Sequence, residues 1–167
     1  MIVPIAELYP GQGSQEPGMF NKFLKNPDLD VREAGEEVVE EGLLKLGSDG
    51  VDILHVYSED NVPSDKLNNT RNVQPGLATL SVMYRKSVEN KLGFEFSPHV
   101  ASGFSFGALP SLYALGVLSL EDMLEIAMMR GESMSLIKPG QYSVLTIKTE
   151  GEAHVGRTNW GPLRRTL

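Results

Sequence analysis

The chain has 167 residues, a formal net charge of −7, 41% hydrophobic residues and no cysteine. A chain of about 150 residues buries roughly 70% of its unfolded surface, so we expect one domain with a real core. The acidic balance argues against a protein that binds nucleic acid by neutralising phosphates. The lack of cysteine excludes disulfide scaffolds, cysteine-ligated zinc and thiol nucleophiles.

One stretch, residues 96–120, contains no formally charged side chain. Its glycines, prolines and serines interrupt it, so we expect a buried strand and helix rather than a membrane span. The first nine residues have no basic start and already include Glu7, which is not typical of a signal peptide. The sequence therefore predicts a cytoplasmic protein with no membrane and no nucleic acid among its partners.

Hydrophobic periodicity and turn residues predict alternating strands and helices, the pattern of an α/β fold. The tail after residue 151 shows no apolar period, and the chain has no internal repeat. In chain order the predicted elements are a buried strand over 2–9, a helix over 31–46 capped by Asp30, an irregular segment over 48–72, a helix over 75–92 that Pro75 opens and Gly93 ends, a buried strand over 99–102, a helix after residue 107, a helix from 118 capped by Ser119, and a strand over 142–148.

The pentapeptide Gly-Phe-Ser-Phe-Gly at residues 103–107 fits the G-x-S-x-G pattern of a nucleophile elbow. Glycines let this turn pack against neighbouring backbone, and the turn exposes the hydroxyl of Ser105 at a helix start, where free N–H groups favour negative charge. The predicted strand before the turn and the helix after it supply the context that the motif requires. The alternative is an ordinary tight turn in which Ser105 caps the helix.

Arg130 interrupts an apolar helical stripe, because it shares a face with Met123 and Ala127. A guanidinium in this position must find an anionic partner or reach water. If it faces a site, its planar fork can hold a substrate carboxylate through two parallel hydrogen bonds. The alternative is an arginine that extends to solvent or pairs with Glu125 or Glu132.

A glycine-rich loop, Gly-Gln-Gly-Ser-Gln at residues 11–15, follows the first predicted strand. Glycines at a strand end let backbone N–H groups point into a cleft, as an oxyanion site requires. The loop has neither the Walker nor the dinucleotide-binding pattern, and alone it indicates only a turn.

Taken in order, four motifs resemble the malonyl-CoA:acyl carrier protein transacylases and the acyltransferase domains of fatty-acid and polyketide synthases. They are residues 9–15, Asn-Val-Gln-Pro-Gly-Leu-Ala at 72–78, residues 103–107, and Met-Arg-Gly at 129–131, and the resemblance covers roughly residues 2–148. It implies an α/β fold with the α/β-hydrolase-like core of the acyltransferase fold, truncated at the start of an inserted ferredoxin-like subdomain. On this basis residues 1–139 form a partial core, and residues 140–167 hold the first strand of the small subdomain and an irregular tail.

The resemblance also implies a reaction. Ser105 would take a malonyl group from coenzyme A as a seryl ester and pass it to the phosphopantetheine thiol of an acyl carrier protein, in fatty-acid or polyketide synthesis. The backbone N–H groups of Gln12 and Phe106 would form the oxyanion hole, and Arg130 would pair with the free malonyl carboxylate. The coenzyme A thioester is then a substrate, and no cofactor and no metal are expected.

The chain departs from the family pattern beside the nucleophile, with Phe104 in place of the usual histidine, Phe106 in place of leucine and Ala108 in place of glutamate. Phe106 still supplies a backbone N–H, but Phe104 removes a polar group from the site wall. Pro110 deletes one backbone hydrogen bond early in the helix that follows.

A serine becomes nucleophilic when a base takes its proton, and the family uses a distant downstream histidine for this step. His99 precedes Ser105 by six residues along a strand, about 20 Å at roughly 3.3 Å per residue. His55 lies in the irregular segment and His154 in the tail. An aspartate or glutamate base stays open, so the base is not assigned.

Two other interpretations stay open. A serine esterase or thioesterase uses the same elbow but has no need of Arg130 or of the loop at 11–15. A non-catalytic fragment would lack the base and leave an apolar sheet edge uncovered.

The net negative charge of the chain would repel an acidic carrier protein unless basic side chains gather locally. The candidates for such a local patch are Arg71, Arg85, Lys86 and Lys91.

Overall fold

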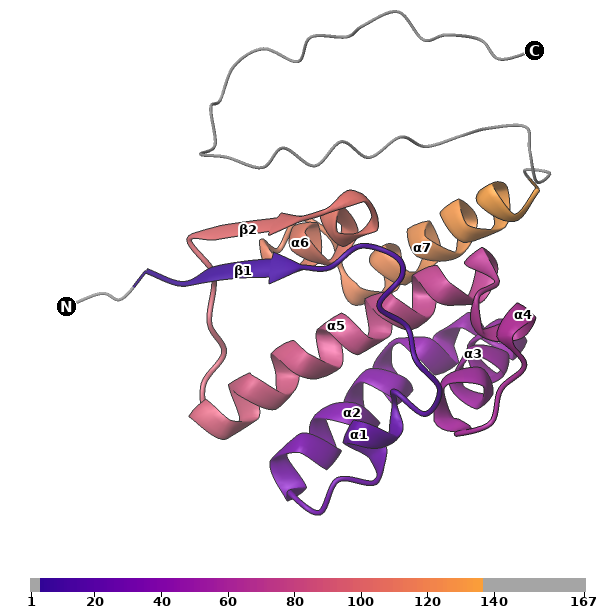
Figure 1. The fold of residues 1–167 in the computed structure, drawn as a ribbon. Helices are drawn as coiled ribbons and strands as arrows, with labels where there is room; N and C mark the ends of the chain where they lie inside the picture. Colours follow the sequence, from indigo (N-terminus) through magenta and orange to yellow (C-terminus); the bar gives the residue numbers. More distant parts are fainter. Residues whose placement is uncertain (1–3, 137–167) are drawn as a thin grey trace, which may run out of the picture.

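The structure, a computed structural model, describes residues 4–136 (Figure 1). The predicted strand over 142–148, the second part over 140–167 and His154 lie outside the described residues. The elements are β1 (Ala6–Tyr9), α1 (Asn21–Leu24), α2 (Leu29–Glu41), the 3-10 helix η1 (Leu43–Leu46), α3 (Ser48–Ser58), α4 (Ser64–Leu67), α5 (Thr70–Leu92), β2 (Val100–Gly103), the 3-10 helix η2 (Ser105–Gly107), α6 (Ala108–Ala114) and α7 (Leu120–Ser135).

The two strands form a parallel pair, in register from Ala6 opposite Val100 to Tyr9 opposite Gly103. The described chain is mostly helical around this small parallel sheet, which confirms the α/β prediction in its coarse form. The expectation of buried strands is wrong, since Leu8 is 81% exposed and Val100 is 57% exposed. Among residues 4–136, no element covers the outer face of the pair.

The core lies between the helices, with α5 packed against α2 and α7 (Figure 1). The apolar side chains of α2 face this core and its glutamates face outward. No helix within residues 4–136 combines the length and the apolar character needed to cross a bilayer. The largest fully buried side chains include Phe20, Leu43, Ile53, Tyr57, Met83, Phe106, Met123 and Leu124.

The helix predicted over 31–46 ends as α2 at Glu41, and η1 follows it. Two helix starts also differ from the prediction, because a neighbouring side chain caps the helix instead. Asp28, not Asp30, caps α2 by accepting a hydrogen bond from the N–H of Val31 at 3.4 Å. Asn69 caps α5 by accepting from the N–H of Arg71 at 3.1 Å. Pro75 therefore lies inside α5 rather than at its start.

The segment over 48–72, predicted to be irregular, forms α3 and α4. α3 contains the apolar residues 51–57 of this otherwise polar segment, and its side chains Ile53 and Tyr57 are almost fully buried, so tertiary packing stabilises the helix. Two other predicted boundaries are confirmed. Gly93 ends α5 with a left-handed φ of 72°, and Ser119 caps α7 by accepting from the N–H of Asp122 at 3.0 Å.

Candidate active site

Ser105 occupies a sharp turn directly after β2. Its φ is 54°, a left-handed value found at no other non-glycine residue among residues 4–136. Such a conformation costs about 1–3 kcal/mol in a non-glycine residue and persists only where the surroundings enforce it. η2 and α6 follow the turn and Ser105 is exposed, so the strand–turn–helix context that the sequence predicts is present.

Close backbone packing requires the glycines of this turn. A Cβ on Gly103 would overlap the backbone of Gly107, and a Cβ on Gly107 would lie 2.5 Å from the carbonyl oxygen of Tyr9. A Cβ on Gly11 would lie 3.0 Å from the carbonyl oxygen of Phe104, whose N–H donates to the Tyr9 carbonyl at 3.2 Å. The end of β1 and the loop after it therefore lie directly against the turn that carries Ser105.

Arg130, on α7, lies beside the same turn. Its Nη1 donates a hydrogen bond to Oε1 of Gln74 at 2.8 Å, and its guanidinium carbon lies 6.0 Å from the centre of the Phe106 ring. The sequence left open a pairing with Glu125 or Glu132, but within residues 4–136 Arg130 forms no ion pair. Gln74 is neutral, so no carboxylate within residues 4–136 neutralises the charge of Arg130.

Gln74 is the residue that the sequence interpretation missed. It is fully buried on α5, and its amide contacts two other segments of the chain, the loop after β1 and α7. Oε1 accepts from Arg130, while Nε2 lies 3.5 Å from Oε1 of Gln12 and 3.0 Å from Sδ of Met134. Its only signal in the sequence is its place in the motif over 72–78. In the structure it links the glycine-rich loop to Arg130.

The loop after β1 is held by its own side chains. The N–H of Gly13 donates to Oε1 of Gln15 at 2.9 Å, and the Gln15 amide donates to Oδ1 of Asn68 at 2.7 Å. Gln12 lies in this loop and Phe106 follows Ser105, so both flank the carboxyl ends of the parallel strands. In open α/β sheets this edge is where ligands bind. The assignment of their N–H groups to an oxyanion hole stays a prediction.

Neither histidine of the described residues lies at the elbow. His99 precedes β2, and its Nδ1 accepts from the N–H of Ile5 at 3.3 Å, at the end of the strand pair opposite to Ser105. His55 is exposed on α3 and its Nε2 lies 3.2 Å from Glu59. The base that would activate Ser105 is therefore not a histidine of residues 4–136.

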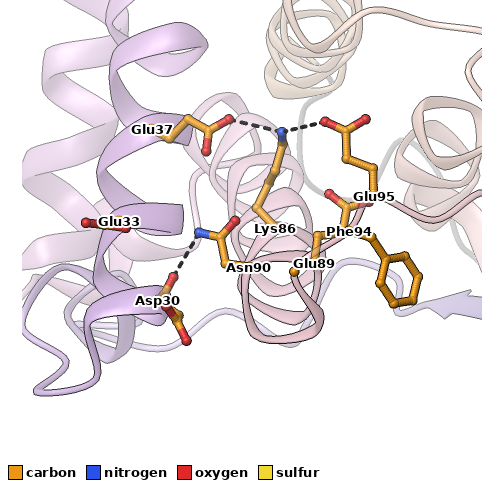
Figure 2. A pocket seen from close by; sticks show the side chains of 9 residues that line it. Asp30, Glu33, Glu37, Lys86, Glu89, Asn90, Phe94 and Glu95 are labelled. Carbon is orange, nitrogen blue, oxygen red and sulfur yellow. Dashed lines mark hydrogen bonds and ion pairs between the residues drawn. The ribbon is translucent and has the colours of Figure 1, made fainter.

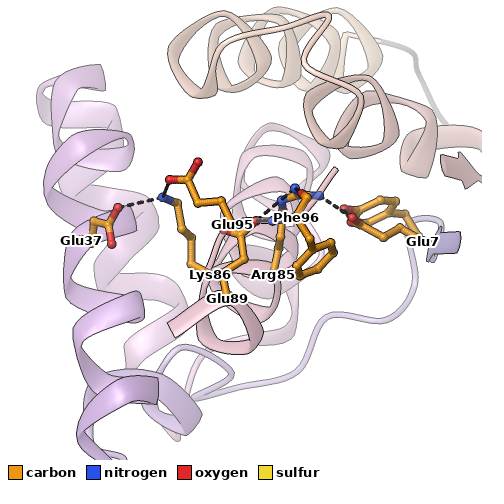
Figure 3. A network of polar contacts seen from close by, with 8 residues as sticks. Glu7, Glu37, Arg85, Lys86, Glu89, Glu95 and Phe96 are labelled. Carbon is orange, nitrogen blue, oxygen red and sulfur yellow. Dashed lines mark hydrogen bonds and ion pairs between the residues drawn. The ribbon is translucent and has the colours of Figure 1, made fainter. Parts of the chain in front are cut away.

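The basic side chains considered for carrier docking do not form the local patch that such docking requires. Each of the four is engaged by carboxylates, so the condition is not met by these residues. Figure 3 shows the pairs of Arg85 with Glu7 and Glu89 and of Lys86 with Glu37 and Glu95. The other two pairs are Arg71 with Asp49 and Lys91 with Asp28.

A hollow of about 530 Å³ opens between α2 and α5, away from Ser105 (Figure 2). Lys86 bridges Glu37 and Glu95 across it, and Asn90 donates to the carbonyl of Asp30 at 3.1 Å. Carboxylates outnumber cations on its walls. Because like charges repel, this hollow suits neither a malonyl carboxylate nor a coenzyme A phosphate.

Comparisons with known proteins point to the same family, although no protein-family model matches the chain. The chain is 29% identical over 148 residues to the malonyl CoA-acyl carrier protein transacylase of Bacillus subtilis, covering 87% of this chain and 34% of that protein. The enzyme of the same name from Staphylococcus aureus is 31% identical over 134 residues, covering 80% and 39%.

A solved structure gives the same result. The acyl-carrier-protein S-malonyltransferase of Burkholderia pseudomallei superposes with a TM-score of 0.62 at 29% identity, over 82% of this chain and 40% of that one. The resemblance to the transacylase family is thus confirmed over most of the chain. The chain spans about a third to two fifths of the length of these relatives.

Proposed function

We propose that this chain, which is homologous to part of the malonyl-CoA:acyl carrier protein transacylases, carries the nucleophile and the carboxylate-binding arginine of a malonyl-transfer site in an α/β-hydrolase-like core. The observation that supports this most is the arrangement around Gln74. A fully buried amide holds Arg130 next to the turn that exposes Ser105, and the same amide reaches the glycine-rich loop.

In the proposed reaction, Oγ of Ser105 attacks the thioester carbonyl of malonyl-CoA and gives up its proton. The carbon–sulfur bond breaks, coenzyme A leaves as a thiol, and the malonyl group stays on the serine as an ester. The N–H groups of Gln12 and Phe106 would stabilise the negative charge on the carbonyl oxygen. The phosphopantetheine thiol of an acyl carrier protein then attacks the ester, and Ser105 recovers a proton. Neither a cofactor nor a metal is needed.

Arg130 would select malonyl over uncharged acyl groups. A hydrogen bond to a charged group contributes about 1.5–3 kcal/mol, which corresponds to roughly 10- to 150-fold in rate or affinity. Gln74 occupies Nη1 of the guanidinium, so the remaining N–H groups can meet the malonyl carboxylate. An acetyl group has no carboxylate to use this interaction.

Mass spectrometry after incubation with malonyl-CoA tests the proposal. We expect a malonyl adduct that Ser105→Ala abolishes, and a loss in Arg130→Ala that is much larger for malonyl than for acetyl loading. An intact Ser105 that never gains mass would remove the catalytic role from this chain. Release of free malonate in the absence of a carrier thiol would favour a hydrolase instead.

A further inference from the structure

Phe104 presents an apolar ring to solvent beside the nucleophile. Its side chain is 73% exposed, more than any other aromatic side chain in residues 4–136. A single exposed apolar residue is ordinary on a protein surface, so exposure by itself assigns no role. This ring, however, directly precedes Ser105 at the carboxyl ends of the parallel strands, where open α/β sheets bind ligands.

The backbone of Phe104 is fixed on both sides, although its ring is exposed. Its N–H donates to the carbonyl of Tyr9 at 3.2 Å, and its carbonyl accepts from the N–H of Gly107 at 2.9 Å. Cδ1 of the ring lies 3.0 Å from the point where a Cβ on Gly11 would stand, so the ring rests against the glycine-rich loop. A side chain that is already held in place loses little conformational freedom when a ligand covers it.

The candidate site is buried on the side of Arg130 and open on the side of Phe104. Gln74 and Phe106, which both contact Arg130, are 0% and 1% exposed. Ser105 separates Phe106 from Phe104 in the chain and is itself exposed. In the proposed reaction the malonyl carboxylate reaches Arg130. The sulfur of the thioester and the chain attached to it therefore point away from Arg130, toward the exposed side that carries Phe104.

We propose that the ring of Phe104 contacts the pantetheine chain of the coenzyme A thioester, so that the site selects thioesters that carry this chain. The inference rests on the proposed function, because it takes Ser105 as the acylated residue and Arg130 as the group that binds the carboxylate. The pantetheine chain consists of methylene and methyl groups joined by amides. When such a chain covers an exposed ring, apolar area of both partners leaves water, which stabilises the complex.

The other parts of the thioester fit Phe104 less well. The malonyl carboxylate and the phosphates of coenzyme A are charged, and a charged group against an apolar ring loses hydration without gaining a partner. The pantetheine chain is the uncharged part between them. An apolar ring next to Ser105 is thus complementary to the part of the substrate that follows the sulfur.

Ligand binding to the full chain carrying Ser105→Ala tests this contact without turnover. Titration calorimetry compares malonyl-CoA, malonyl-pantetheine, which lacks the nucleotide, and the S-methyl thioester of malonate, which lacks the whole chain. Each ligand is measured with Phe104 intact, with Phe104→Ala and with Phe104→Tyr, which keeps the ring. Phe94→Ala is the matched control, because Phe94 is 57% exposed and lines the acidic hollow between α2 and α5.

We expect Phe104→Ala to weaken the binding of malonyl-CoA and of malonyl-pantetheine about two- to tenfold, the range of one lost aromatic contact, and to leave the S-methyl thioester unchanged. Phe104→Tyr and Phe94→Ala should bind all three ligands as their parent does. Equal weakening of all three ligands would overturn the proposal, and so would weakening of malonyl-CoA alone or unchanged affinities in Phe104→Ala.

The outcomes also separate this proposal from the proposed function. If Ser105 of the unsubstituted chain never gains a malonyl group but the effect of Phe104→Ala persists, the proposed function is wrong and the contact stands. If Ser105 is acylated and Phe104→Ala binds the ligands as its parent does, the contact is wrong and the proposed function stands. Failure of all three ligands to bind would contradict both.

Discussion

Replacement of Arg85 by methionine tests how much the buried ion pairs between α5 and β1 stabilise the fold. The guanidinium pairs with Glu7 on β1 and with Glu89 on its own helix, donates to the carbonyl of Phe96, and lies 4.8 Å from the centre of the Phe96 ring (Figure 3). Burial alone would lower the pKa of Arg85, but the two carboxylates offset it and the pKa is raised. Arg85 therefore stays charged whenever the chain is folded.

The expected loss follows from burial. The side chains of Arg85, Glu7 and Glu89 are 10%, 13% and 6% exposed, so removing the guanidinium leaves two buried carboxylates without their cationic partner. Breaking a buried pair in this way costs about 3–5 kcal/mol. A domain of this size is stable by only about 5–15 kcal/mol, so Arg85→Met should remove a large part of the free energy of unfolding.

Arg71→Met is the matched control, because Arg71 and its partner Asp49 are 47% and 43% exposed. An exposed pair contributes about 0–1 kcal/mol. Urea unfolding of the full chain at pH 7, followed by circular dichroism, measures both variants. The triple variant Glu7→Val, Arg85→Met and Glu89→Leu should recover much of the loss, because apolar groups replace all three charges. Equal losses in the two single variants would refute the reasoning from burial.

Three further results are expected. Gln74→Leu should lower malonyl loading of Ser105 roughly 10- to 150-fold relative to acetyl loading, because the variant removes the acceptor that holds Arg130. Equal losses for both acyl groups would show that Gln74 does not act through Arg130. Gly107→Ala places a Cβ 2.5 Å from the Tyr9 carbonyl oxygen, so the turn must move away from β1. Amide hydrogen exchange in β1 and β2 should then accelerate, and unchanged exchange would contradict the close packing of Gly107 against Tyr9. Burial raises the pKa of the Tyr57 hydroxyl above its value in the unfolded chain, so the free energy of unfolding falls as the pH rises above about 10, where the unfolded chain loses this proton first. In urea titrations, Tyr57→Phe should therefore show a shallower decline in the free energy of unfolding between about pH 9 and 11. An unchanged slope would disprove this linkage.

Local patterns predicted the parts of the fold that local chemistry controls. The elbow at Ser105, the end of α5 at Gly93 and the cap at Ser119 depend on a few neighbouring residues, and each is where the sequence places it. The parallel pairing of the strands then brings the loop with Gln12 against the elbow, as the order of the motifs implied.

Apart from the two helix caps, the errors concern features that depend on distant partners. Burial of Leu8 depends on what covers the sheet, which the strand itself does not encode. Pairing of the basic residues on α5 depends on carboxylates from β1 and α2, far away in the sequence. Gln74 is similar, because an amide in a helix gains its importance only when folding buries it between the loop and Arg130.

We propose that Ser105 and Arg130 belong to one site, in which Arg130 binds the malonyl carboxylate. Titration calorimetry of Ser105→Ala with malonyl-CoA and acetyl-CoA, with and without Arg130→Ala, tests it without turnover. We expect Ser105→Ala to bind malonyl-CoA at least tenfold more tightly than acetyl-CoA, by about 1.4 kcal/mol or more, and the double variant to lose this preference. The same preference in both variants would show that Arg130 does not contact the malonyl group, which would contradict its proposed role in the site.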